Sequence, residues 1–216
     1  MATNREYSSD LHPTGFTPWS DTAPAHGDLL AAKALVYDPC GFTCSQPVPE
    51  AESAAYAAHA FTLDGLSVRF RAAKTTPTKV GQFVTVWKRS PGGPIQPFDA
   101  TDPVDLFVIS TRDQHNLGQF VIPMDALRRH GVTSAHGSGG KRAFRVYPPW
   151  VTTTNRQAGM AQAWQLDYFL PLPQDGSIDS ARAQELYHPC DDTGTTTGRA
   201  GPVVAGVPAR VVKRID

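Results

Sequence analysis

The stretch VDLFVISTRDQHNLGQFVIP, residues 104–123, decides the fold class of this chain. Two apolar runs, VDLFVIS and LGQFVIP, flank the polar sequence TRDQHN. β-Branched and aromatic residues favour strands, and a polar segment between two such runs is typical of an antiparallel hairpin. Both runs are nearly continuous in apolar residues, which indicates deep burial. We therefore expect a buried strand pair at the centre of a sheet.

Further strands and a few short helices are predicted on either side of this hairpin. Asp64-Gly65 is a hairpin turn before the strand LSVRFRAA, and VGQFVTVWKR and RAFRVYP are further strands. Helical spacing with end signals predicts helices from Asp28 to before Pro39, over MDALRRH, and through RQAGMAQAWQLDYF. The expected fold class is α+β, with a central mixed or antiparallel β-sheet flanked by a few helices.

Length and composition predict one folded unit with irregular ends. The chain has 216 residues, 40% of them hydrophobic, with 19 Pro and 18 Gly. We expect a flexible N-terminal arm over residues 1–27, a core domain over 28–170 and a disordered C-terminal extension over 171–216. No apolar run has the length of a bilayer-spanning helix and the start has no signal pattern, so we expect a cytoplasmic protein without a membrane partner.

The cysteines do not indicate a disulfide framework or a metal site. Cys40, Cys44 and Cys190 are odd in number, which fits a reducing compartment. A structural zinc site usually needs a second close pair of ligands, which the sequence lacks. We expect neither a metal nor another cofactor.

The net charge of zero conceals two segments without acidic residues. Residues 65–98, the first basic block, carry six basic side chains and no Asp or Glu. Residues 126–166, the second basic block, also carry six basic side chains and no acid. Such blocks, if the fold brings them together, give the electrostatic footprint of a protein that binds polyanions.

The sequence GGKRAFRVYPPW, residues 139–150, places basic and aromatic residues on one strand of the second basic block. Side chains alternate along a strand, so Lys141, Ala143, Arg145 and Tyr147 are expected to share one face. That face is either an ordinary solvated surface or a surface that holds an anionic, flat ligand.

Several segments together resemble the MepB-like protein family. They are AAKTTPTKVGQFVTVWKR, DPVDLFVIS, GQFVIP, GGKRAFRVYPPW and WQLDYF, in this order, and the similarity runs from about residue 28 to residue 170. The resemblance implies a mixed-sheet core akin to restriction-endonuclease-like folds, with nucleic acid as the expected ligand. It implies no particular reaction, because a fold does not fix an activity.

A nuclease of that fold would need two carboxylates and a lysine to hold a divalent metal and the attacking water. Asp105 begins a strand in a suitable place, but the next strand carries Gln119 and Val121 at the other positions. We therefore prefer a structural hydrogen bond as the role of Asp105. A lysine from elsewhere, such as Lys79, with Glu50 or Glu52, remains an alternative way to complete such a site.

The leading hypothesis is a nucleic-acid-binding protein that contacts the phosphate backbone with little sequence specificity and without cleavage. The alternatives are a metal-dependent nuclease or another enzyme that acts on a phosphorylated substrate, and a protein-interaction module with a basic face. DNA and RNA stay open, as does the oligomeric state. The predicted binding residues are Arg69, Arg71, Lys74, Lys79, Lys88, Arg89, Lys141, Arg142, Arg145, Tyr147 and Trp150.

Overall fold

The buried hairpin predicted from the sequence is the centre of the structure. The computed structural model describes residues 19, 25–89, 92–173 and 175–188. Strands β8 (Leu106–Arg112) and β9 (Leu117–Pro123) pair antiparallel, from Leu106 opposite Pro123 to Arg112 opposite Leu117. The carboxylate of Asp113 closes the turn by accepting hydrogen bonds from the backbone amides of His115 and Asn116, each at 2.8 Å.

Six strands form the central sheet, in the order β1-β2-β3-β8-β9-β11. Strands β1 (Val48–Pro49), β2 (His59–Leu63) and β3 (Leu66–Ala72) lie on one side of the hairpin, and β11 (Phe169–Pro171) lies on the other. Strand β3 runs parallel to β8, whereas the other neighbours are antiparallel. This arrangement confirms the predicted α+β class with a central mixed sheet.

The predicted turn at Asp64-Gly65 joins β2 to β3. Both residues have positive φ angles, 48° for Asp64 and 88° for Gly65. Two consecutive left-handed residues are what a two-residue hairpin of type I′ requires, and Asp and Gly tolerate this conformation better than other residues. The turn therefore fixes the pairing of Leu63 with Leu66.

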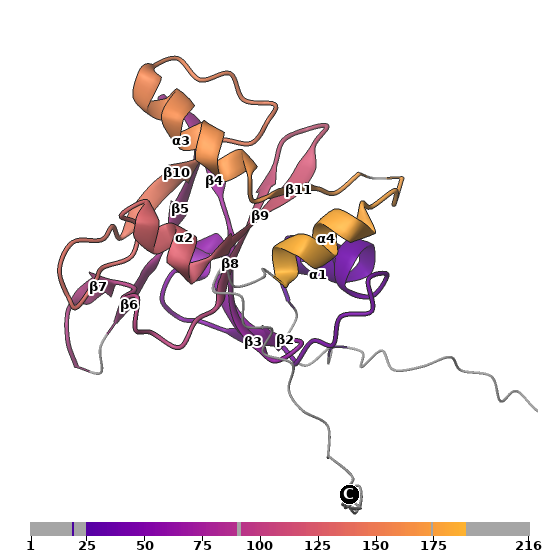
Figure 1. The fold of residues 1–216 in the computed structure, drawn as a ribbon, viewed down its shortest axis with the longest axis horizontal. Coiled ribbons are helices and arrows are strands. Elements are labelled where there is room, and N and C mark those ends of the chain that lie inside the picture. Colours follow the sequence, from indigo (N-terminus) through magenta and orange to yellow (C-terminus); the bar gives the residue numbers. More distant parts are fainter. Residues whose placement is uncertain (1–18, 20–24, 90–91, 174, 189–216) are drawn as a thin grey trace, which may run out of the picture.

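Helices cover one face of the central sheet. Helix α1 (Gly27–Ala32), the π-helical turn η1 (Lys33–Tyr37) and helix α4 (Ser180–Tyr187) lie together on one side of the central strands (Figure 1). Their apolar side chains pack with Val68, Val108 and Val121, which point to this face. The single helix predicted from Asp28 to Pro39 thus corresponds to α1 and η1 in succession.

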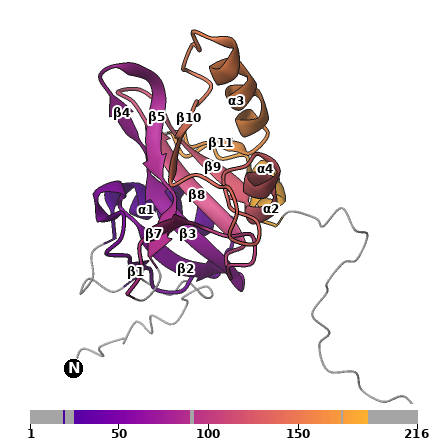
Figure 2. The ribbon, with the colours of Figure 1, turned by 90° about the vertical axis from the view of Figure 1, so that its left-hand side faces the viewer.

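The opposite face is covered by a second, smaller layer (Figure 2). Strands β4 (Lys74–Thr76), β5 (Lys79–Thr85) and β10 (Ala143–Val146) form a sheet in the order β10-β5-β4. Helices α2 (Met124–Arg129) and α3 (Arg156–Leu166) complete this layer. Phe107, Ile109 and Phe120 from the central sheet pack against it.

The stretch VGQFVTVWKR is divided between two sheets, where the sequence predicted one strand. Strand β5 ends at Thr85, and β6 (Trp87–Arg89) pairs instead with β7 (Ile95–Pro97). Between them, Val86 is buried and its amide donates to the carbonyl of Arg142 at 2.9 Å. The buried residue Val86 thus separates two strands that pair in different sheets.

The disordered extension predicted after residue 170 is wrong for helix α4. Ala183, Leu186 and Tyr187 of α4 are buried, and the Tyr187 hydroxyl donates to Oε1 of Gln119 at 2.9 Å.

Trp19, within the predicted arm, also contacts the core through an edge-on packing with Phe61. Residues 189–216, Cys190 among them, and most of the arm lie outside the described residues. Among the described residues, no helix is long and apolar enough to cross a membrane.

Replacing Tyr187 by alanine tests whether α4 belongs to the folded core. Tyr187 is fully buried, so Tyr187→Ala should lower the free energy of unfolding by about 3–5 kcal/mol, as for other large buried side chains. Glu185→Ala in the same helix is the control, because the Glu185 side chain is 69% exposed and its ion pair with Arg182 contributes less than about 1 kcal/mol. Urea denaturation of both variants measures the difference. Equal, small effects would mean that α4 is not part of the core.

Candidate functional site

The fold brings acidic residues from outside the two basic blocks to half of their basic side chains. Glu50, Glu52, Asp102 and Asp125 pair with six of the twelve. The six residues are Arg69, Arg71, Lys88, Arg89, Arg128 and Arg129. The charge pattern along the sequence therefore overstates the positive charge that is available to a ligand.

Glu50 forms ion pairs with two of the predicted binding residues, one of which is buried. Nη1 of Arg71 lies 2.7 Å from Oε2 of Glu50 and also donates to the carbonyl of Phe70 at 2.8 Å. Nε of Arg69 lies 3.4 Å from Oε1 of the same carboxylate. The Arg71 side chain is only 1% exposed, and burial lowers its pKa. The prediction that Arg71 lies on a ligand-binding surface is therefore wrong, because the guanidinium is enclosed with its counter-ion.

Lys88 and Arg89 of β6 are engaged away from the second basic block. Lys88 forms an ion pair with Asp102, and Nε of Arg89 lies 3.3 Å from Oε1 of Glu52. Nζ of Lys74 lies 5.1 Å from the ring centroid of Tyr56, and Lys74 is opposite Phe83 of β5, which is in turn opposite Arg145 of the second basic block. Of the six basic residues of the first basic block, Lys79 is the one that lines the hollow described next.

A hollow of about 600 Å³ lies between β10, the end of the β4–β5 hairpin and helix α3. We call it the basic hollow. Among the described residues that line it there is no Asp or Glu. Its charged, titratable and aromatic lining includes Lys79, His130, Lys141, Arg145, Tyr147 and Trp164.

The predicted face of GGKRAFRVYPPW lines this hollow. Lys141, Ala143, Arg145 and Tyr147 all contribute to it, together with Phe144 from the alternate face of β10. Arg142 is exposed but is not among the lining residues. Trp150 packs edge-on against Phe169 at a centroid distance of 5.6 Å, so it belongs to the core beneath.

Arg145 fixes the hairpin that forms one wall of the hollow. Its Nη1 donates to the carbonyl of Gly81 at 3.0 Å, and its Nη2 donates to Oγ1 of Thr76 at 2.7 Å. The guanidinium also lies over the Phe83 ring, 5.6 Å from the centroid. Arg145 thus keeps its positive charge in the hollow while its donors hold β4 and β5 in place.

Helix α3 is joined to β10 by a buried amide. Oε1 of Gln165 accepts from the backbone amide of Tyr147, and its Nε2 donates to the carbonyl of Arg145, each at 2.9 Å. Gly81, at φ 82°, permits the close approach of the Tyr147 ring, because a Cβ there would lie 2.6 Å from two ring carbons. These contacts give the hollow fixed walls on two sides.

His130 and Trp164 form a feature that the sequence reasoning missed. Their rings stack in parallel, with centroids 4.0 Å apart and planes inclined by 8°. Both residues line the basic hollow. The position of His130 directly after Arg128 and Arg129 is the one signal in the sequence that could have included it in the basic set.

Two cations in the hollow, one from each basic block, are available to a ligand. In the part of the chain that the structure describes, the side chains of Lys79 and Lys141 have no hydrogen bond or ion pair. Together with Arg145 they make the lining positive without a compensating carboxylate. Whether these residues bind nucleic acid stays a prediction.

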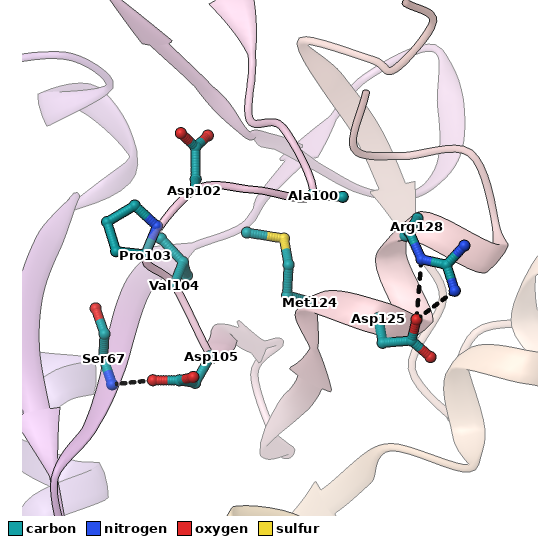
Figure 3. Close-up of a pocket in the computed structure, with 9 residues that line it drawn as sticks. All are labelled: Ser67, Ala100, Asp102, Pro103, Val104, Asp105, Met124, Asp125 and Arg128. Carbon is teal, nitrogen blue, oxygen red and sulfur yellow. Dashed lines mark hydrogen bonds and ion pairs between the residues drawn. The ribbon is translucent and has the colours of Figure 1, made fainter. Parts of the chain in front are cut away.

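A second hollow, of about 460 Å³, contains Asp102, Asp105 and Asp125, but the three carboxylates are directed apart (Figure 3). Oδ2 of Asp105 accepts from the backbone amide of Ser67 at 2.7 Å, as the preferred structural role of Asp105 required. Asp125 pairs with Arg128, and Asp102 pairs with Lys88. No group of three potential metal ligands occurs within residues 25–89, 92–173 and 175–188.

Glu50 and Glu52 provide a matched test of which ion pairs support the fold. Glu50→Ala would leave Arg71 buried without its carboxylate, and removal of one partner from a buried pair costs about 3–5 kcal/mol of unfolding free energy. Glu52→Ala breaks a pair in which Arg89 is 49% exposed, so the cost should stay below about 1 kcal/mol. Thermal and urea unfolding of both variants would show the difference. Similar small losses would contradict a structural role for Arg71.

Comparisons with known proteins agree with this architecture. A solved structure of MepB is 34% identical, with a TM-score of 0.57 over 59% of this chain and 86% of that chain. A bacterial homing endonuclease, I-Ssp6803I, is 16% identical over 65% of this chain and 88% of its own, but its TM-score of 0.36 is too low to support an argument. No curated protein matches the chain. The MepB-like family model matches residues 50–171, which is more than half of the sequence, and the chain belongs to this family.

Proposed function

We propose that the basic hollow binds nucleic acid through its phosphate backbone, with little sequence specificity and without cleavage. The observation that carries the proposal is the acid-free lining, to which Lys79 and Lys141 contribute from different basic blocks. Each phosphate that a lysine or arginine neutralises releases condensed counterions, which favours binding irrespective of base sequence. The lining therefore matches a polyanion better than a neutral ligand.

The walls of the hollow also suit an extended ligand with flat groups. Arg145, Gln165 and Tyr147 hold β10, the hairpin and α3 together, so the ligand would meet cations that are already positioned. Tyr147 and Trp164 add aromatic surface to the lining, and aromatic side chains stack on unpaired bases whatever their identity. Arg69, Arg71, Lys88 and Arg89 have no part in this interface because their charges are paired elsewhere.

Substitutions in the hollow should weaken binding to oligonucleotides of mixed sequence. Lys79→Ala and Lys141→Ala should each reduce affinity and lower the slope of log affinity against log salt by about one, the value for one lost phosphate contact. Arg142→Ala is the matched control, because Arg142 adjoins Lys141 and is exposed outside the hollow. Fluorescence anisotropy at several salt concentrations measures both quantities.

Three outcomes would contradict the proposal in different ways. Absence of binding even at low salt would remove nucleic acid as the ligand. Equal losses from Lys79→Ala, Lys141→Ala and Arg142→Ala would indicate general surface charge and no specific hollow. Equal affinity for polyglutamate, a flexible acidic polypeptide, would favour a protein-interaction module.

DNA and RNA should remain intact when incubated with the protein and Mg²⁺ or Mn²⁺. Gln119, at the position where a nuclease would need a carboxylate, is fully buried and accepts a hydrogen bond from Tyr187. Val121, at the position of the nuclease lysine, is also fully buried. Gel analysis of end-labelled substrates tests this expectation. Metal-dependent fragments that disappear with Asp105→Ala would show instead that the protein is a nuclease.

A further inference from the structure

His130 occupies a distinctive place in the basic hollow. It follows helix α2 directly, and its ring lies flat against Trp164 of helix α3. A parallel stack covers one face of the imidazole but leaves its edge, which carries both nitrogens, uncovered by the indole. Neither ring nitrogen has a hydrogen bond within the part of the chain that the structure describes. The ring is therefore held in position with its polar edge available.

The surroundings of His130 favour its neutral form in the free protein. Burial is the largest cause that lowers its pKa below the ordinary value, and the positive charges of Arg129 and Lys141 act in the same direction. Asp167, at the end of α3, opposes them and raises the pKa, but the net direction is downward. At neutral pH the imidazole is thus an uncharged member of an otherwise positive lining.

We propose that His130 is a proton-linked anion contact, which binds a phosphate of the nucleic acid as an imidazolium and so takes up one proton on binding. This inference rests on the proposed function, because it assigns a role in the same hollow. The ligand chemistry that it requires is a phosphodiester, which is negative throughout the range in which histidine titrates.

The charges in the hollow determine the direction in which phosphate binding changes the pKa of His130. A bound phosphodiester offsets the repulsion from Arg129 and Lys141 and attracts a proton to the imidazole, so the pKa of His130 rises on binding. The stacked indole also tolerates the charged ring, since a cation over the face of tryptophan is attracted to it. The free protein thus has the lower pKa of His130 and the complex the higher one.

Affinity for nucleic acid should increase as the pH falls, because the pKa of His130 is higher in the complex than in the free protein. Above the pKa of the complex His130 is neutral in both states and contributes nothing to the pH dependence. As the pH falls between the raised pKa of the complex and the lowered pKa of the free protein, affinity increases by up to about tenfold per pH unit for one proton. Below both pKa values the gain is complete and affinity becomes level.

The experiment measures affinity against pH for the full-length chain at constant ionic strength. The probe is an oligonucleotide without terminal phosphates, because a phosphomonoester would itself titrate near pH 6. His130→Phe keeps a flat ring for Trp164 but cannot take up a proton, and His130→Gln keeps a polar side chain without the titration. His115→Gln is the control, because His115 is an exposed histidine outside the basic hollow.

The wild type and His115→Gln should bind more tightly as the pH falls from about 8 to about 5, the range in which histidine titrates. Both variants at His130 should lose most of this dependence and should converge with the wild type at high pH. Nuclear magnetic resonance of the imidazole should show a higher pKa of His130 with the oligonucleotide than without it. A merely structural role for the ring would change affinity at every pH and leave the slope intact.

The results would distinguish an error in the role of His130 from an error in the proposed function. If no protein binds the oligonucleotide at any pH, nucleic-acid binding itself is wrong. If the wild type binds with no pH dependence, or if His130→Phe keeps the full dependence, the hollow still binds nucleic acid but His130 is not the proton-linked contact.

Discussion

Burial of β8 and β9 on both faces is the constraint on which the rest of the structure depends. Their side chains alternate between two apolar clusters, so the sheet needs a cover on each side. Helices α1 and α4 with η1 supply one cover, which is closed by Tyr187 and Tyr37. The other cover combines a small sheet with α2 and α3 (Figure 2). The basic hollow is lined by residues of this layer.

Much of the fold was predictable because local patterns and tertiary structure agree. The Asp64-Gly65 turn and the continuous apolar runs of β8 and β9 are strong local signals. Helix α4 was missed because SARAQELY is short and mostly polar. Only Ala183, Leu186 and Tyr187 point to the core. Its stability comes from packing, which a local pattern does not record.

The candidate site was only partly predictable, because charge along the chain differs from charge in space. Alternation along GGKRAFRVYPPW grouped Lys141, Arg145 and Tyr147, and all three line the hollow, although Phe144 lines it as well. The sequence gives no sign that Glu50, outside the basic blocks, reaches both Arg69 and Arg71 across the β-sheet. Four of the twelve cations in the acid-free segments pair with a carboxylate that is distant in sequence, and two more, Arg128 and Arg129, pair with Asp125 at the edge of the second block.

A neutral chain can nevertheless present a strongly positive hollow, because electrostatic interactions in salt are local. The Debye length is about 8 Å at physiological ionic strength, so a ligand in the hollow is little affected by exposed carboxylates farther away. Six basic-block residues have no carboxylate partner among the described residues, and these six lie in the small sheet, directly before β10 or at the start of α3. Zero net charge removes long-range attraction to polyanions, whereas the walls of the hollow concentrate the field at close range. The binding that we propose would therefore depend on contacts made after encounter, within walls that Arg145 and Gln165 hold in place.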